Sequence, residues 1–563
     1  MEDLRTCREI ADSYVDSMVE LDPIKATELG LPQGNDRLPD FSPAGAGQTA
    51  SLNRATLARL ATVGGAQQAI AAERQCARLL QERLEAELSL LDTGEHLRQV
   101  GAMTTPVAKT RMAFTLMPTA SEQDWSQIAA RLRAVPTALA GYQESLLEGM
   151  TTGRTAGPTA TDALIDSLDD CATWYTRLVD PGTAQAAALT ADLTDAARGA
   201  AGAHTELKDW LREVYRPVVE STPDGVGADR YAHGARFWNG SDLDGAQTYA
   251  WGWTEFGRID TEMRVEANRV LPGSTPAAAM EYLNEQGPAI EGVENVRRWL
   301  QKIMDDAVDT LDGVQFRLAE PVRRVETMIA PEGSAPAPYY TPPTLDFSRP
   351  GRTWLPTLGR TRFPTWNLLG IWYHEGVPGH HLQLGQWIHS IGELSRYQTT
   401  LGMVSANVEG WALYAERLMD ELGLYPDPAS RLGFLAAQQM RAVRVIIDIG
   451  LHLGLTIPAD QGGAAAFEPG RAWTPALAEQ FLNLNAGIGA EFARSEVARY
   501  LEMPGQAIGY KLGERAWLAG REKARARLGA RFDQCAWHTS ALATGSLGLD
   551  DLVTELAGFG DQD

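Results

Sequence analysis

Long stretches of strong helix formers, broken at clusters of glycine and proline, restrict most how this chain can fold. Ala, Leu, Glu, Arg and Gln dominate up to about residue 315, and the same texture returns beyond Pro364. Such residues lose little side-chain freedom in a helix, whereas Gly and Pro favour turns. We therefore predict a mainly α-helical protein, with helices over 66–93, 121–148, 183–217, 243–269, 289–312, 365–393, 399–422, 430–455, 474–500 and 506–528.

The texture changes between about residues 314 and 358. The segments FRLAEPVRRVETMI and PYYTPPTLDFSRPGRTWLP combine prolines with alternating β-formers and aromatics, which a long helix would not tolerate. We predict a small β-sheet here, in which Thr353 to Thr357 form a short strand that an extended peptide could pair with. The expected organisation is a helical region 1–315 and a second region 316–563, which could also form one continuous body around a cleft.

Charge and composition exclude several classes of partner. The chain has 50 basic and 73 acidic residues, so its net charge of −23 would repel nucleic acid and anionic lipid. The N-terminus lacks the apolar core of a secretory signal, and no apolar run is long enough to span a membrane. The four scattered cysteines suggest neither a disulfide framework nor a cysteine metal site. We expect a cytoplasmic protein without nucleic-acid or membrane partners; the oligomeric state stays open.

The segment IWYHEGVPGHHLQ at 371–383 is the strongest chemical signal, because three of the nine histidines fall within it beside a glutamate. In the zincin signature, two histidines four residues apart bind zinc and the glutamate after the first polarises the attacking water. In this sequence Pro378 stands where that second histidine would be. The segment predicts His374 as a metal ligand and Glu375 as the catalytic base.

A regular helix could not bring His374 together with either later histidine around one ion, because the spacings of six and seven residues separate them. Pro378 and Gly379, however, favour a bulge or break. Such a distortion would return His380 to the side of His374, so we favour His380 as the second ligand. His381 is the alternative, and the histidine that is not a ligand could contact a ligand or the substrate.

The following segment, SANVEGWALYAERLMDELG, offers the third ligand. Glu409 and Glu416 are seven residues apart and share one helical face. We assign Glu409 to the metal. Glu416 is predicted either to orient a histidine ligand or to be a solvated charge.

Hydrolysis of a peptide bond builds negative charge on the carbonyl oxygen, so a hydrogen-bond donor is needed opposite the metal. Tyr500, Tyr510 and His538 are the candidates, and Tyr510, after the break at Pro504–Gly505, is our first choice. Each tyrosine could instead anchor a helix in the core.

Two further groups of residues could support such a site. Arg441 and Arg444 could bind a substrate carboxylate or form structural ion pairs, and Tyr340 could line the mouth of the site or pack inside. Asp448 and His452 are four residues apart on one predicted helix, so they could hydrogen bond, either to tune the site or to stabilise the helix.

Four segments carry a resemblance to a known family: YHEGVPGHHLQ at 373–383, VEGWALYAERL at 408–418, RAVRVIIDIGLH at 441–452 and EVARYLEMPGQAIGYKLGE at 496–514. The sequence resembles the DUF885 family of bacterial proteins, which is grouped with the gluzincin metallopeptidases. The resemblance covers most of the chain and is most specific across 336–550. It implies one Zn²⁺ ion, a helical body with a small sheet, and hydrolysis of peptide bonds. Gly548 departs from the pattern, which has proline there.

The resulting hypothesis is a zinc peptidase that acts on short or unfolded peptides, as a carboxypeptidase or an oligopeptidase. Two alternatives remain: a zinc amidase or aminoacylase that acts on a small metabolite, and a non-catalytic helical binding protein with a degenerate metal site.

Overall fold

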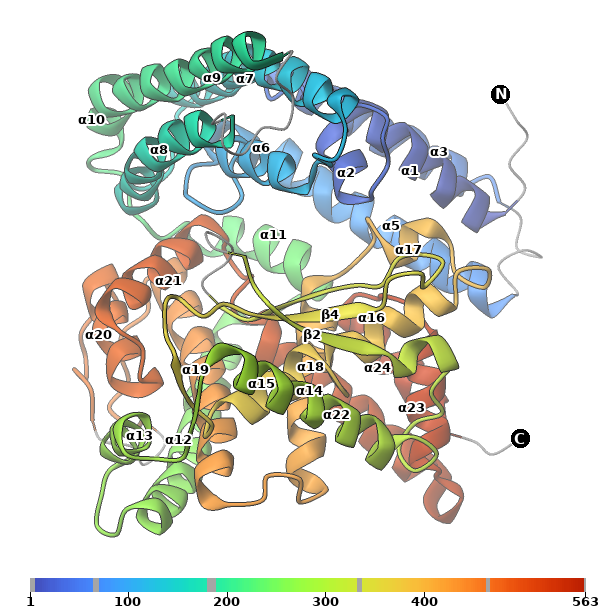
Figure 1. Ribbon diagram of the computed structural model, residues 1–563. Helices are drawn as coiled ribbons and strands as arrows, with labels where there is room; N and C mark the ends of the chain where they lie inside the picture. Colours follow the sequence, from blue (N-terminus) through green and yellow to red (C-terminus); the bar gives the residue numbers. More distant parts are fainter. Residues whose placement is uncertain (1–5, 64–69, 180–188, 332–336, 462–465, 561–563) are drawn as a thin grey trace. The chain divides into compact units, whose positions relative to one another are not determined.

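The computed structural model describes residues 6–63, 70–179, 189–331, 337–461 and 466–560. Within them helices predominate and the strands are short (Figure 1), which confirms the predicted mainly α fold with a small sheet. No helix of these residues is long and apolar enough to cross a membrane. The chain divides into two compact units, Met1–Phe237 with Arg494–Pro504, and Trp238–Ala493 with Gly505–Asp563.

The boundary between the units follows Phe237, and not residue 315 as the sequence texture predicted. In the second unit α12 (Gly245–Val270) packs on α19 (Pro428–Leu453), and α14 (Val293–Leu311) packs on strand β2 (Val325–Ile329). These helices therefore share a core with the later part of the chain. Helical texture alone does not show which core a helix joins, which explains the error.

In its described part the first unit consists of helices. Thr6 and Glu9 form a capping box at α1, and Ser121 and Asp124 form another at α7, so the local sequence sets where these helices begin. One apolar core cluster of this unit lies between α6, α7, α8 and α9. The predicted helix starts at 66 and 183 lie outside the described residues. The helices are α1 (Cys7–Leu21), α2 (Pro23–Glu28), α3 (Pro43–Leu60), α5 (Ala71–Asp92), α6 (Pro106–Leu116), α7 (Glu122–Thr151), α8 (Pro158–Leu178), α9 (Thr190–Trp210) and α10 (Arg216–Val219), with α11 (Ala228–Asn239) and α21 (Ala490–Glu502) running across unit boundaries.

The second unit combines helices with two small sheets. The predicted helix 365–393 is two helices in the structure, α15 (Leu368–Glu375) and α16 (His380–His389). The remaining helices are α13 (Pro276–Glu285), α17 (Arg396–Thr399), α18 (Ser405–Glu421), α20 (Pro475–Ala486), α22 (Gly509–Leu528), α23 (Gln534–Ala543) and α24 (Leu549–Gly558).

The three-stranded sheet has the order β2-β4-β3, with β4 (Gly351–Leu355) parallel to β2 and antiparallel to β3 (Tyr339–Thr341). β1 (Ala289–Glu291) and β5 (Arg362–Pro364) form a separate antiparallel pair. The strand predicted at 353–357 is β4, which begins at Gly351 and ends at Leu355, and it is the central strand. The prediction that an extended peptide could pair with it is therefore wrong. Strands β2 and β3 are the edge strands of this sheet, because β4 pairs with a strand on each side.

Helices α18 and α22 lie side by side, and their contact sets the position of two candidate site residues (Figure 1). A Cβ atom on Gly410 would lie 2.3 Å from the Cα atom of Gly513, so only glycine at both positions permits this approach. Next to the crossing, the buried rings of Trp411 and Trp517 pack with centroids 4.8 Å apart. This close packing fixes the distance between the backbone of α18 at Glu409 and the backbone of α22 at Tyr510.

Candidate metal centre and cavity

The turn between α15 and α16 brings together two histidines that a continuous helix would separate. Helix α15 ends at Glu375, the chain turns through Gly376–Gly379 with a cis peptide bond before Pro378, and α16 begins at His380. A Cβ atom on Gly379 would lie 1.9 Å from the carbonyl oxygen of His374, so this path requires glycine. The distortion that the sequence predicted is thus a complete break, with the rings of His374 and His380 4.8 Å apart.

Three donor atoms converge at this turn. Oε2 of Glu409 lies 3.4 Å from Nε2 of His374 and 3.7 Å from Nε2 of His380. Donor atoms around one zinc ion, with bonds of about 2.0–2.2 Å in a tetrahedral arrangement, are themselves separated by roughly 3.4 Å. The Oε2 atom is also buried without a hydrogen-bond partner. Two imidazoles and a carboxylate at this spacing fit a zinc ion, and they form the one such cluster found among the described residues.

Glu416 orients the first of these histidines. Its Oε1 atom lies 2.7 Å from Nδ1 of His374, and both side chains are buried. With Nδ1–H donated to Glu416, the lone pair of Nε2 points toward Glu409, as metal binding requires. Glu416 therefore orients His374 and is not a solvated charge.

Replacing Glu416 by alanine should weaken zinc binding by about 10- to 100-fold, because His374 loses the partner that sets its tautomer and orientation. Competition with a chromogenic chelator would measure the affinity. Glu421→Ala is the matched control, since Glu421 lies on the same helix and pairs with Arg521 instead. Equal zinc affinities for both variants and the wild type would show that Glu416 has no such role.

His381 faces away from this cluster. Its Nε2 atom donates to the carbonyl oxygen of Val322 at 2.7 Å, which leaves Nδ1 as the acceptor for the hydroxyl of Tyr340 at 2.9 Å. Burial lowers the pKa of His381 to about 4, so the ring stays neutral. His381 therefore positions Tyr340 and is neither part of the donor cluster nor free to contact a reacting atom.

A cavity of about 420 Å³ opens beside the donor cluster. Such a volume lies within the range of roughly 300–1,000 Å³ that is common for small-molecule sites. The sequence-predicted residues that line it are His374, Glu375, His380, Glu409, Tyr340, Arg441, Arg444 and Tyr510. Glu375 makes no side-chain hydrogen bond to another described residue, so its carboxylate is available to a water molecule or a substrate.

Two arginines lie against the ring of Tyr510 on the cavity wall. The guanidinium of Arg444 lies 4.8 Å from the ring centroid and that of Arg441 lies 5.9 Å from it, both within cation–π distance. Tyr510 therefore lines the same cavity as Glu375. It does not anchor a helix in the apolar core, which was the alternative prediction.

The structure leaves the other predicted residues outside this cavity. His538 is fully buried, with Nε2 bonded to Tyr414 and Nδ1 to the carbonyl of Gln315, so the prediction that it contacts the substrate is wrong. Tyr500 belongs to the first unit, where its hydroxyl donates to Glu496.

Asp448 has a structural role. Oδ1 of Asp448 lies 3.9 Å from Nε2 of His452, and Oδ2 accepts a hydrogen bond from the backbone N–H of Gly505. Neither residue lines the cavity. Asp448 therefore anchors the segment that leads into α22, and does not orient a residue of the donor cluster.

Burial and charge separate the pKa values of the four central groups. Burial alone would lower the pKa of His374, but Glu409 and Glu416 raise it to about 9. Burial lowers the pKa of His380 to about 4, against the charge of Glu409. For Glu409, contact with His374 and the charges of His380 and Arg441 outweigh burial and lower the pKa to about 2. Burial, with the charge of Glu409, raises the pKa of Glu375 to about 7.

These values predict proton release on zinc binding. At pH 7 the metal-free site holds a proton on His374, which zinc must displace, while His380 is already neutral and Glu409 ionised. About one proton should leave, with a further fraction from Glu375. Zinc affinity should therefore rise with pH up to about pH 9. Calorimetric titrations with zinc in two buffers of different ionisation enthalpy would measure the number of protons released per zinc ion bound. Release of no proton would contradict the assignment of His374 as a zinc ligand.

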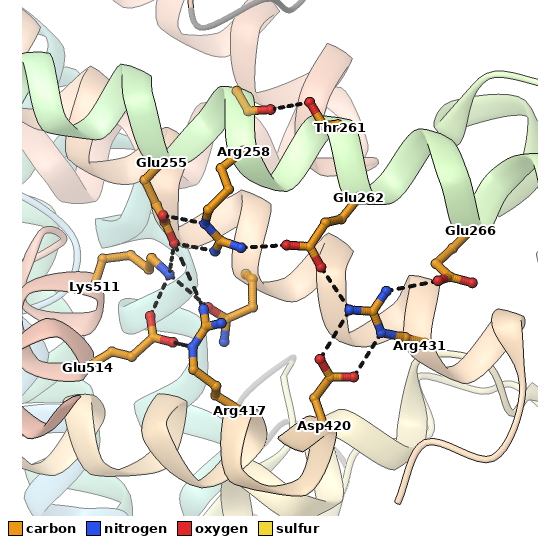
Figure 2. Close-up of polar contacts among 12 residues, drawn as sticks. Glu255, Arg258, Thr261, Glu262, Glu266, Arg417, Asp420, Arg431, Lys511 and Glu514 are labelled. Carbon is orange, nitrogen blue, oxygen red and sulfur yellow. Dashed lines mark hydrogen bonds and ion pairs between the residues drawn. The ribbon is translucent and has the colours of Figure 1, made fainter. Parts of the chain in front are cut away.

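A network of ion pairs fixes the helices that carry the site (Figure 2). Lys511, next to Tyr510, is buried and lies 2.9 Å from Glu255 of α12 and 2.5 Å from Glu514 of its own helix. Glu514 also pairs with Arg417 of α18. Sequence reasoning missed this network; the spacing of Lys511 and Glu514 was a visible signal, but their partners on other helices were not.

The comparisons with known proteins agree with the fold. A family model described as "Bacterial protein of unknown function (DUF885)" matches residues 23–556. The "putative lipoprotein from Colwellia psychrerythraea" superposes with a TM-score of 0.82 at 21% identity, covering 98% of each chain. A "putative lipoprotein of unknown function from Shewanella oneidensis" gives a TM-score of 0.75 at 17% identity, covering 98% of this chain and 100% of the other. The comparison with curated proteins found no match.

Proposed function

The chain belongs to the DUF885 family, as its sequence resemblance predicted, and we propose that it is a zinc-dependent peptidase that hydrolyses peptide bonds of oligopeptides. One observation carries the proposal: the donors of His374, His380 and Glu409 converge beside the available carboxylate of Glu375 in one cavity. Two histidines, a carboxylate ligand and an adjacent glutamate are the residue types that zinc hydrolases use. The gluzincin relationship is part of this proposal.

His374, His380 and Glu409 would hold the ion. When bound there, zinc would act as a Lewis acid toward a carbonyl oxygen and lower the pKa of water toward neutrality. A neutral His380 and an ionised Glu409 are already in the protonation states that a metal ligand needs.

Glu375 is the general base in this proposal. Its carboxylate accepts a proton from water as the water oxygen attacks the carbonyl carbon, and it passes that proton to the nitrogen when the C–N bond breaks. In the metal-free protein, burial and the charge of Glu409 raise the pKa of Glu375 to about 7. No covalent bond between enzyme and substrate is needed.

Two tyrosines have different roles. Tyr510 lines the cavity, and its hydroxyl is the proposed donor to the carbonyl oxygen as negative charge develops there. Tyr340 already donates its hydroxyl hydrogen to His381, so its oxygen is left as an acceptor toward a substrate N–H group. Tyr339 and Tyr340 belong to the edge strand β3 and also line the cavity, and strand addition beside β3 is the proposed way to hold an extended peptide.

The test combines metal analysis with a substrate screen. Protein purified without chelators should contain, or take up, one zinc ion per chain and should cleave peptides in a mixed peptide library. N-acyl amino acids, tested in parallel, represent the amidase or aminoacylase alternative. Cleavage of N-acyl amino acids alone would overturn the peptidase proposal, and a folded protein that binds no zinc would favour the non-catalytic binding protein.

The proposal keeps the expected partners and location. A peptide is the proposed substrate, and the net charge of −23 disfavours nucleic acid and anionic membranes. We also propose a cytoplasmic location, which is supported by the lack of disulfide bonds among the described residues.

A further inference from the structure

Several arginines of the second unit form ion pairs with carboxylates. Figure 2 shows Arg258 between Glu255 and Glu262, and Arg431 of α19 among three carboxylates. Arg431 pairs with Glu262, Glu266 and Asp420 at 2.8, 2.8 and 2.9 Å. In a chain with this excess of acidic residues, an arginine finds a carboxylate partner easily.

Arg441, farther along the same helix, is different. Its Nη1 atom donates to the carbonyl oxygen of Ala437 in the preceding turn, and its Nε atom is buried without a hydrogen-bond partner. Among the described residues no carboxylate forms an ion pair with it. Leaving a buried donor of a charged group unsatisfied is costly, so the arrangement is better explained by a ligand than by stability.

The position of Arg441 shows where such a ligand would lie. Its side chain lines the same cavity as Glu375 and Glu409, and it is near enough for its charge to influence both. The Tyr510 ring packs against Arg441 and Arg444, which restrains the planar guanidinium groups. A restrained guanidinium with unused N–H donors is suited to bind a carboxylate through two parallel hydrogen bonds.

We propose that Arg441 binds the free C-terminal carboxylate of the peptide substrate. The chain is then an enzyme of the carboxypeptidase type, which removes one or a few residues from the C-terminus. This inference rests on the proposed function, because it assigns a substrate class to the same cavity. Arg444 adds a second positive charge at this end of the substrate, and the cavity of about 420 Å³ accommodates the end of a peptide.

The binding test uses the full-length Glu375→Gln protein loaded with zinc, so that peptides are retained and not cleaved. An equal mixture of randomised tripeptides with free C-terminal carboxylates and the same peptides as C-terminal amides is passed over the immobilised protein. Mass spectrometry gives the ratio of acids to amides retained. We expect enrichment of the acids by about 10- to 100-fold, the usual range for losing a hydrogen bond to a charged group.

Variants connect this preference to Arg441. Adding Arg441→Met should remove most of the enrichment and leave only the effect of the Arg444 charge, and Arg441→Lys should restore part of it, because lysine keeps the charge without the planar fork. Arg264→Met is the matched control. Arg264 lies on α12, its side chain is half exposed, and it pairs with Asp260. Thermal unfolding midpoints would show that each variant is folded. Equal retention of acids and amides by the Glu375→Gln protein, or enrichment that Arg441→Met leaves undiminished, would overturn the inference.

Cleavage by the wild type separates the two proposals. Removal of C-terminal residues from the acid library, with kcat/KM at least about 10-fold lower for the amides and KM raised in Arg441→Met, supports both. Equal cleavage of acids and amides would overturn the role of Arg441 and leave the peptidase proposal standing. Selective retention of acids without cleavage of any peptide would contradict the peptidase proposal and the carboxypeptidase assignment, but the binding of a C-terminal carboxylate by Arg441 would stand.

Discussion

Glu375→Gln should abolish peptide hydrolysis while zinc remains bound. Glutamine has nearly the same shape as glutamate, but it cannot accept a proton from water or deliver one to the leaving amine. General acid–base groups contribute about 10²- to 10⁴-fold to rates, so a loss of this size in kcat is expected. Because Glu375 is outside the donor cluster, zinc affinity should change little. Steady-state kinetics on a cleaved peptide and a metal titration would measure both.

Glu294→Gln is the control for this experiment. Glu294 is exposed on α14 and pairs with Arg297, so the same chemical change there should leave both kcat and zinc content unaltered. Should Glu375→Gln retain more than about a tenth of the wild-type kcat, Glu375 would not be the base. Loss of zinc along with activity would instead indicate that Glu375 helps to hold the ion.

His380→Ala should remove zinc binding almost completely, whereas His381→Ala should not. The Nε2 atom of His380 is one of the three converging donors, and both ring nitrogens of His381 are already bonded to other groups. Loss of a metal ligand should lower zinc affinity by more than the roughly 10- to 100-fold that is typical when a residue hydrogen-bonded to a ligand is removed. Zinc affinity by chelator competition provides the measurement.

The two neighbouring histidines control for each other in this experiment. His381→Ala should lower activity moderately through Tyr340, which loses its hydrogen-bond acceptor, while its zinc content stays near one ion per chain. If His381→Ala loses zinc and His380→Ala retains it, the assignment of the second ligand is reversed.

Most of the helices could be predicted from the helix-forming composition of the sequence and from its breaks at glycine and proline. The break at Pro378–Gly379 was predictable because proline removes a helix hydrogen bond. The sequence favoured His380 but left His381 as an alternative, because the path of the turn depends on contacts across it, such as the hydrogen bond from the N–H of Gly379 to the carbonyl of Tyr373. A strand was predicted at 353–357, two residues later than β4 lies, and its central place could not be predicted because it depends on pairing with distant segments.

The candidate site shows the same division. Spacing on one helical face placed Glu409 and Glu416 together, and both lie where that argument put them. His538 was misassigned because its partners, Tyr414 and the carbonyl of Gln315, are distant in sequence. Likewise, no pattern distinguished the cavity-facing Arg441 from Arg431, whose acidic partners come from two other helices.

The most direct test of the central claim is X-ray anomalous scattering at the zinc absorption edge, recorded from crystals of the protein grown with zinc. We predict one strong peak between Nε2 of His374, Nε2 of His380 and Oε2 of Glu409. A fully occupied peak at another position, with these three side chains left without an ion, would contradict the account.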